Sequence, residues 1–541
     1  MSDDEESRPS DEQMALSVQL HAWNDSPSSD APLIDSLPPE LLVRILEEVY
    51  LAHQRSGTHW APSPWTIPYQ LVCRRWRDVI SSTPSLWQRI NVYAGAESLE
   101  FYLTRCAGAL ATVHVWDPSS PDKTFATLRC HAWHIRAYHV HCDVPELDYL
   151  SGLPLLLATP MPALEALSLD GPYREDQTLD VPITHDLAPR LTALNLRNSK
   201  SPRDIAMYTP LRSLTLSGSQ WTISYDEFLD VMSKCRDLEC LNLDEEVLDP
   251  FSDELANPTT GHPPRMTPVV LPRLKVLELR GQVALLFHLL ATLHAPQATT
   301  IELMNRLDDD EPGPLVTRLL APNPQLRYPF LSSPRAVSVS CWDGAPFRLS
   351  VRCGPDSNAL LSIDYGMRHD LPANSYLEPN LVDIMDFFSV VSVDTLEVEG
   401  DLDKVAVETW QRIFEAFQNL RTLLIKGRGT FDSLWLGLQR ATTSSVERDG
   451  VVCCPFLSEI VVDDPPWRVS SFEFEATATV FGLIPGVLGA RADAGGARLQ
   501  KLQLYLHYTD ELWSQMSELR DAFVEDVKAL VEELDYRDGR T

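Results

Sequence analysis

A short pattern of apolar and polar positions recurs through most of the chain. Two apolar residues lie three positions apart and a third follows two positions later, as in Leu-x-x-Leu-x-Leu. The last two apolar positions alternate with other residues, which is the period-two pattern of a half-buried strand. Clear copies begin at Leu164, Leu191, Leu211, Leu238, Leu274, Val393, Leu420, Leu457 and Leu499, and weaker copies begin at Leu110, Ile135 and Ala298. Each copy therefore predicts one short strand whose alternate side chains point into a core.

This pattern resembles the leucine-rich repeat, in which each repeat gives one strand and a returning segment. The resemblance implies an α/β solenoid with a continuous parallel sheet, and helical returns are predicted at residues 224–238 and 408–420. The Asn or Cys expected eight residues after the first Leu is absent, so irregular turns are predicted. In its place stand Pro172, Ser199, Ser219, Glu246 and Gln282. The repeat positions are hardest to assign in residues 305–392, which could hold extra strands. A β-sandwich is the alternative, but the three-then-two spacing favours the solenoid.

Two amphipathic segments precede the repeats. In the first, apolar residues recur at spacings of three and four, which predicts one apolar helix face: Leu41, Leu42, Ile45, Leu46 and Val49. Pro39 suits the first helical position and Glu40 suits the positive end of the helix dipole. The second segment predicts a helix that ends before Pro84, with one apolar side formed by Tyr69, Val72, Cys73, Trp76 and Val79.

These two segments resemble an F-box. The family's Leu-Pro and acidic residue are present as Leu37, Pro38 and Glu40, and its Val-Cys-Arg-x-Trp element begins at Val72. The following SLWQRINV resembles the turn and strand after many fungal F-boxes, whereas the link at residues 53–67 is longer than usual and predicts a loop. The resemblance implies docking onto the Skp adaptor of a cullin-based ubiquitin ligase. The residues it implies for that contact are Leu37, Pro38, Leu41, Leu42, Ile45, Leu46, Val72, Cys73 and Trp76. The alternative is an ordinary pair of amphipathic helices whose apolar faces form a core and have no docking role.

The last segment, residues 508–541, predicts an amphipathic helix that Thr509 can cap. Its apolar face comprises Leu512, Met516, Leu519, Phe523, Val527, Leu530 and Leu534. Because a repeat array needs its last repeat covered, this helix is predicted to be a lid. A partner-binding helix is the alternative.

Composition and charge narrow the choice of partner and compartment. The net charge is −32, from 77 acidic and 45 basic residues, which argues against nucleic acid or an anionic membrane as principal partner. Residues 1–32 are acidic and rich in Ser, Asp and Pro, the composition of a disordered tail. No basic signal-peptide region or membrane-length apolar stretch is visible. Ten scattered cysteines without a CxxC pair favour a reduced cytoplasmic or nuclear setting.

One cluster of chemically active side chains lies in CHAWHIRAYHVHC, residues 130–142. His139 and His141 alternate with Tyr138 and Val140, so both histidines are predicted to face the open side of the sheet and to contact a target. The spacing matches no zinc module, which disfavours the metal-site alternative. No GxSxG, HExxH, P-loop or GxGxxG motif is present, and no cofactor is predicted.

The sequence thus predicts four segments: a disordered acidic tail at 1–32, an F-box at 33–92, a leucine-rich-repeat-like solenoid at 93–507 and a C-terminal helix at 508–541. The corresponding hypothesis is a non-catalytic substrate-recognition subunit of an Skp–cullin–F-box ubiquitin ligase, whose repeats bind an unknown target protein. Two alternatives remain: an Skp-bound scaffold without a degradation role, and a repeat-fold enzyme.

Overall fold

The computed structural model forms two compact units, residues 1–91 with 101–109 and residues 92–100 with 110–541. We call them the N-terminal unit and the repeat unit, and each is described separately. The structure describes residues 37–55, 69–92, 96–116, 120–141, 152–171, 179–256, 268–306, 316–320, 324–342, 347–354, 358–366, 374–388, 391–428, 431–463, 474–508 and 510–540. The predicted disordered tail, most of the 53–67 loop and Thr509 lie outside these ranges.

The N-terminal unit contains helix α2 (Pro39–Arg55), helix α4 (Arg74–Ser82) and a 3₁₀ turn at Pro84–Trp87. Strand β1 (Arg89–Val92) follows, and its last residue belongs to the repeat unit. Helix α2 begins at Pro39 with Glu40 in its first turn, as predicted. The single helix predicted across Tyr69 to Val79 is wrong in one respect. The chain leaves helical geometry after residue 70, turns, and starts α4 only at Arg74. Cys73 is extended, with φ −159°, and its carbonyl accepts the backbone N–H of Arg77 at 3.1 Å.

The core of the N-terminal unit is small and aromatic. Its buried residues include Leu42, Leu46, Trp76, Ile80, Leu86 and Trp87. The indole N–H of Trp87 donates to the Ile80 carbonyl at 2.7 Å, which satisfies its polar group inside the core. The 3₁₀ turn is therefore tied to the end of α4.

The repeat unit is built on one long sheet. Neighbouring strands pair in the order β2-β3-β4-β5-β6-β7-β9-β11-β14-β13-β12-β15-β16-β17-β18-β19. The bounds are β2 (Ala111–Trp116), β3 (Ile135–His141), β4 (Ala166–Asp170), β5 (Ala193–Arg197), β6 (Ser213–Ser217), β7 (Cys240–Leu243), β9 (Val276–Gly281), β11 (Thr300–Arg306), β12 (Pro334–Cys341), β13 (Phe347–Cys353), β14 (Ala359–Gly366), β15 (Thr395–Asp401), β16 (Thr422–Arg428), β17 (Glu459–Asp463), β18 (Leu499–Tyr508) and β19 (Val531–Arg540). A separate parallel pair joins β8 (Val269–Val270) to β10 (Leu293–His294).

Every copy of the apolar pattern coincides with a strand of this sheet. In β5, for example, Leu194 and Leu196 are buried, while Asn195 between them is half-buried. Adjacent copies pair residue for residue, with Leu194 opposite Leu167 and Leu214. Side chains of alternate residues therefore form continuous buried rows across the sheet, because the side-chain period of a strand is two.

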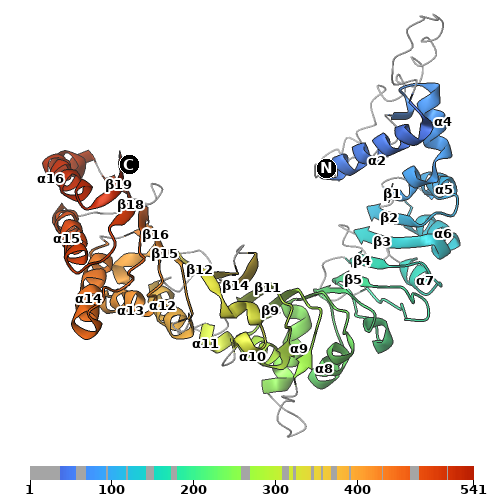
Figure 1. Cartoon of the computed structure of the whole chain (residues 1–541). Coiled ribbons are helices and arrows are strands. Elements are labelled where there is room, and N and C mark those ends of the chain that lie inside the picture. The colour runs from blue at the N-terminus through green and yellow to red at the C-terminus, as the bar shows by residue number, and fades with distance from the viewer. Residues whose placement is uncertain are drawn as a thin grey trace, which may run out of the picture. The chain divides into compact units, whose positions relative to one another are not determined.

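Helices return the chain between strands and cover one face of the sheet (Figure 1). They are α6 (Pro121–Cys130), α7 (Leu153–Leu157), α8 (Tyr225–Lys234), α9 (Glu245–Ala256), α10 (Val283–Thr292), α11 (Val316–Leu319), α12 (Asn374–Phe388), α13 (Val407–Ala416), α14 (Asp432–Asp449), α15 (Phe474–Asp493) and α16 (Asp510–Lys528). A further helix, α5 (Ala96–Arg105), is divided between the two units. The predicted returns are confirmed as α8 and α13. Ser224 caps α8 through a capping box with Glu227, which satisfies backbone N–H groups at its first turn. We call the other side of the sheet, which carries none of the described helices, the uncovered face.

Residues 305–392, where the repeat positions were hardest to assign, contain a reversal of strand order. Strands β12, β13 and β14 form antiparallel pairs, β12 with β13 and β13 with β14. The last of them, β14, lies parallel to β11, and the first, β12, lies parallel to β15. Strand β13 alone among the described strands of the sheet therefore runs against its neighbours.

The prediction of one helix through residues 508–541 is wrong for its second half. Helix α16 ends at Lys528, and Val531–Arg540 forms β19, which pairs in parallel with β18. Leu534 lies opposite Leu502 in this pair rather than on a helix face. Pairing with β18 satisfies backbone groups that a longer helix would leave at a sheet edge. Helix α16 packs beside α15 and β19, so it extends the helical layer and is not a terminal lid.

The predicted fold class is confirmed in its main features. The chain has N-terminal helices followed by a long, largely parallel sheet with alternating helices, consistent with an irregular leucine-rich-repeat-like solenoid.

Candidate functional site

Helix α2 leaves half of its apolar stripe in contact with solvent. Leu42 and Leu46 are fully buried in the N-terminal unit, whereas Leu41 and Ile45 are 48% and 42% exposed. Residues four apart lie on one side of a helix, so Leu41 and Ile45 form one exposed apolar ridge. Burying a leucine or isoleucine side chain completely contributes about 1.5–3 kcal/mol. This ridge is therefore a favourable contact for a partner protein.

A second exposed apolar site lies in the turn before α4. Leu71 and Val72 are 52% and 57% exposed, and the backbone N–H of Val72 donates to the Tyr69 carbonyl at 3.3 Å, which closes the turn. Both side chains therefore contact solvent over about half of their surface. The apolar periodicity placed Val72 on the apolar side of a helix, and it gave no sign of Leu71.

The structure divides the nine residues assigned to adaptor contact into two groups. Leu42, Leu46 and Trp76 are buried in the core between α2 and α4. Those accessible to a partner are Leu37, Pro38, Leu41, Ile45, Val72 and Cys73, with Leu37 and Cys73 half-buried. The Arg75 guanidinium donates to the Leu37 carbonyl, which ties the start of α2 to α4.

His139 and His141 lie on the uncovered face of β3, as the alternation predicts, with Tyr138 and Val140 buried between the sheet and its helices. His139 stacks on His114 of β2, with ring centroids 4.3 Å apart, and His141 stacks on Trp116 at 4.0 Å. The two stacking partners were missed because the β2 copy of the repeat is weak. Aligning the β2 copy with the β3 copy places His114 opposite His139 and Trp116 opposite His141. The sequence therefore did contain the information needed to find both ring pairs.

A third histidine of the same segment is buried rather than exposed. His134 is 1% exposed in the turn before β3, next to Trp133 and His131. Neither of its ring nitrogens has a hydrogen-bond partner among the described residues. Burial, with a smaller contribution from the neighbouring His131, lowers the pKa of His134 below 6.5. The native chain therefore disfavours the protonated form of this imidazole relative to the unfolded chain.

We expect replacement of His134 by leucine to make folding less sensitive to acid. A histidine whose pKa is lower in the native state binds fewer protons there than in the unfolded state. Stability is consequently lost as pH falls through the unfolded value of about 6.5. The drop in melting temperature between pH 7.5 and pH 5.5 should be smaller for H134L than for the wild type. Equal drops in both proteins would contradict this prediction.

Among the described residues, neither a metal-binding cluster nor the Cys453–Cys454 pair gives an accessible reactive site. No cluster of three or more His, Cys, Asp or Glu residues among them could hold a metal ion. A hydrogen bond with the Cys454 thiol, helped by nearby Arg491, lowers the pKa of Cys453 to about 7. Both cysteines are fully buried, so neither thiol can act as a nucleophile toward a ligand in solution.

Comparison with known families agrees with the geometry of the N-terminal unit. The F-box-like family model matches residues 34–93, which include α2, the exposed turn and α4. A search of curated proteins found no match. Within the ranges the structure describes, no helix is both long and apolar enough to cross a lipid bilayer. The F-box-like domain suggests a ubiquitin-ligase adaptor that binds Skp, and F-box proteins of that kind are typically non-catalytic.

Proposed function

We propose that this chain is the substrate-recognition subunit of an Skp–cullin–F-box ubiquitin ligase, acting without a catalytic site of its own. The observation that carries the proposal is the set of exposed apolar side chains inside the F-box-like match. Leu41 and Ile45 on α2, with Val72 in the turn before α4, would contact the Skp adaptor. An apolar surface on so small a helical unit is better explained by a partner than by solvent exposure.

The repeat unit would hold the target protein on its uncovered face. Side chains on that face come from many parallel strands at a fixed spacing, so they present a broad, regular surface. We further propose that the repeats are leucine-rich repeats and that the protein works in the cytoplasm or nucleus. None of the nine described cysteines is in a disulfide, which supports a reducing compartment.

The physical contribution of such a subunit is proximity. A target fixed beside the ubiquitin carrier reacts as if at a high local concentration, because the encounter is no longer a diffusional event between free proteins. The chain would therefore accelerate transfer by holding two other proteins together. It needs no nucleophile or base of its own for this role.

Affinity purification of the full chain from cells, followed by mass spectrometry, tests the proposal. We expect the Skp adaptor and cullin to co-purify in stoichiometric amounts with a small set of further proteins whose lifetimes depend on the chain. Adaptor without cullin would favour a scaffold that recruits nothing for degradation. Absence of the adaptor would refute the docking assignment.

A further inference from the structure

The uncovered face of strands β2 to β5 differs from the rest of the sheet in the side chains it presents. The strand register aligns them in three rows that cross the strands. The first row is Thr112, Ala137, Ala166 and Ala193; the second is His114, His139, Ser168 and Asn195; the third is Trp116, His141, Asp170 and Arg197. We call these residues the ring-and-alanine sector. A row of methyl groups therefore runs beside two rows that begin with aromatic rings.

The rings of this sector are held in fixed orientations by one another. His114 and His139 stack with their planes 7° apart, and Trp116 and His141 with theirs 11° apart. The Asp170 carboxylate lies 3.9 Å from Nδ1 of His141. Side chains that are already ordered lose less conformational entropy when a partner binds. The sector is consequently preorganised for contact with aromatic groups, which pair favourably edge to face or in offset stacks.

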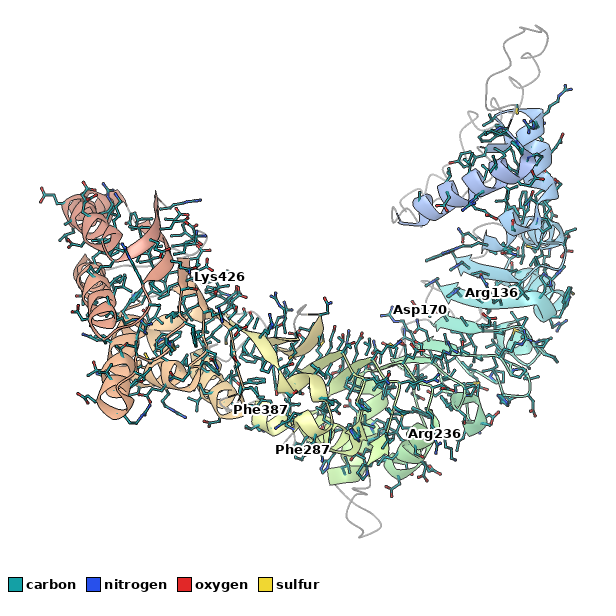
Figure 2. All side chains as sticks on the ribbon, viewed as in Figure 1. Arg136, Asp170, Arg236, Phe287, Phe387 and Lys426 are labelled. Atoms are coloured by element: carbon teal, nitrogen blue, oxygen red, sulfur yellow. The ribbon has the colours of Figure 1, made fainter. Side chains whose placement is uncertain are left out.

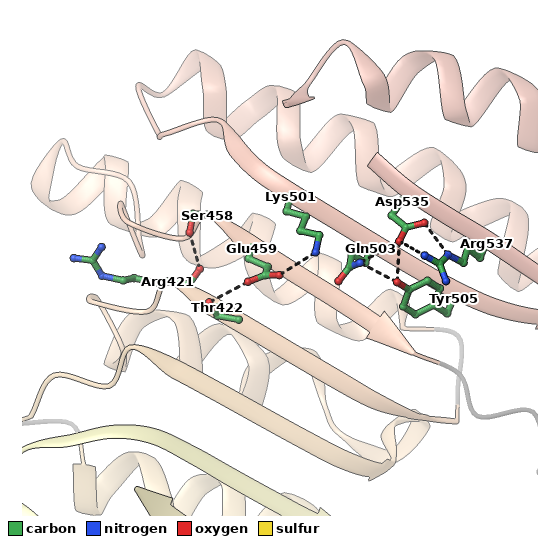
Figure 3. Close-up of polar contacts among 9 residues, drawn as sticks. All are labelled: Arg421, Thr422, Ser458, Glu459, Lys501, Gln503, Tyr505, Asp535 and Arg537. Atoms are coloured by element: carbon green, nitrogen blue, oxygen red, sulfur yellow. Dashed lines mark hydrogen bonds and ion pairs between the residues drawn. The ribbon is translucent and has the colours of Figure 1, made fainter. Parts of the chain in front are cut away.

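Charge distinguishes the sector from the other end of the uncovered face. Asp170 lies 3.6 Å from Arg197, so the sector's fixed charges offset each other, although the whole chain carries a net charge of −32. Figure 2 labels Asp170 on this side of the sheet. Strands β16 to β19 instead present ionic groups along the same face (Figure 3), including the pairs Lys501–Glu459 and Arg537–Asp535. A strongly acidic ligand is repelled by the chain's net charge, and a basic ligand finds more carboxylates at the far end.

We propose that the ring-and-alanine sector binds an extended, uncharged peptide segment of the target protein that carries aromatic side chains. The segment would lie across strands β2 to β5, with its backbone over the alanine row and its aromatic side chains against the histidine and tryptophan rings. The small alanine side chains leave room for the segment beside the taller rings. This inference rests on the proposed function only in assigning target binding to the uncovered face.

The test uses the full chain and a phage-displayed library of random dodecapeptides as the probe. We expect the selected peptides to be uncharged and to contain aromatic residues. Ala166→Arg, which places a long cation in the alanine row, should weaken their binding at least about tenfold. His141→Ala removes one ring without adding bulk and should weaken binding about three- to tenfold. These changes correspond to the loss of one or two well-packed contacts.

Thr422→Arg is the matched control, because Thr422 occupies the row of β16 that corresponds to Ala166 in β4. It should leave peptide affinity unchanged. Failure to enrich any peptide, selection of charged peptides, or equal binding by wild type and A166R would each overturn the inference. Adaptor binding is measured on the same preparations. A chain that binds the adaptor but no peptide fails this inference alone, whereas a chain that binds no adaptor fails the proposed function.

Discussion

Replacing Leu41 with aspartate should strongly weaken binding of the Skp adaptor while the chain stays folded. Leu41 is 48% exposed on α2, so a carboxylate there meets water in the free protein and costs little stability. In the complex the same carboxylate would be buried without a partner, which costs about 2 kcal/mol or more. Adaptor affinity, measured by isothermal titration calorimetry, should fall roughly 30-fold or further.

Leu155→Asp provides the control for this substitution. Leu155 is 62% exposed on α7 of the repeat unit, so it tests whether any exposed leucine gives the same result. Its replacement should leave adaptor binding intact. Trp76→Ala is a contrasting variant, since Trp76 is buried and its loss should destabilise the N-terminal unit by about 3–5 kcal/mol. Unchanged adaptor affinity in L41D would show that α2 is not the docking helix.

Gly427→Ala should destabilise the repeat unit by about 2 kcal/mol, within the range typical of overpacked cores. Gly427 of β16 pairs with Gly400 of β15. A Cβ atom added at Gly427 would overlap the Gly400 carbonyl oxygen and approach the buried Leu402 side chain to 2.9 Å. Because the nearest obstacle is backbone, one strand must shift from its neighbour. Thermal unfolding followed by circular dichroism measures the loss.

The comparison variant is Gly486→Ala in helix α15, where a Cβ atom meets nothing within 4 Å. Alanine is favoured over glycine inside a helix by about 1 kcal/mol, so this substitution should raise the melting temperature. A G427A protein as stable as the wild type would mean that the backbones of β15 and β16 at Gly400 and Gly427 lie farther apart than in the structure.

The strands of the repeat unit were predictable because a local rule repeats. Two buried leucines separated by one residue specify both the strand and the side it buries, as at Leu194 and Leu196. The turns were not predictable from the same rule. Asn198 donates to the Gly171 carbonyl at 3.1 Å, and the N–H of Gly218 donates to Asp244 at 2.6 Å. Asn198 lies one residue before Ser199, the position at which the leucine-rich repeat would place a capping asparagine.

The candidate docking surface was only half predictable from the sequence. Helical periodicity shows that Leu41, Leu42 and Ile45 share a broad face, but it cannot show which part the unit covers with its own residues. That depends on where α4 lies, and its path changes at the turn before Arg74. Leu71 was therefore overlooked, and the burial of Trp76 inside the unit could not be foreseen.

The reversed strand β13 has a consequence for how the repeat unit folds. In a parallel array, each new strand can add to the one just formed, and ordering spreads along the chain. Here β12 follows β11 in the chain, yet β11 pairs with β14, and β12 pairs with β15. Ordering that starts in the early strands must wait at β11 until the antiparallel strands β12 to β14 have formed. We therefore expect a kinetic boundary at this point of the chain, with the strands on either side of it forming as separate cooperative blocks.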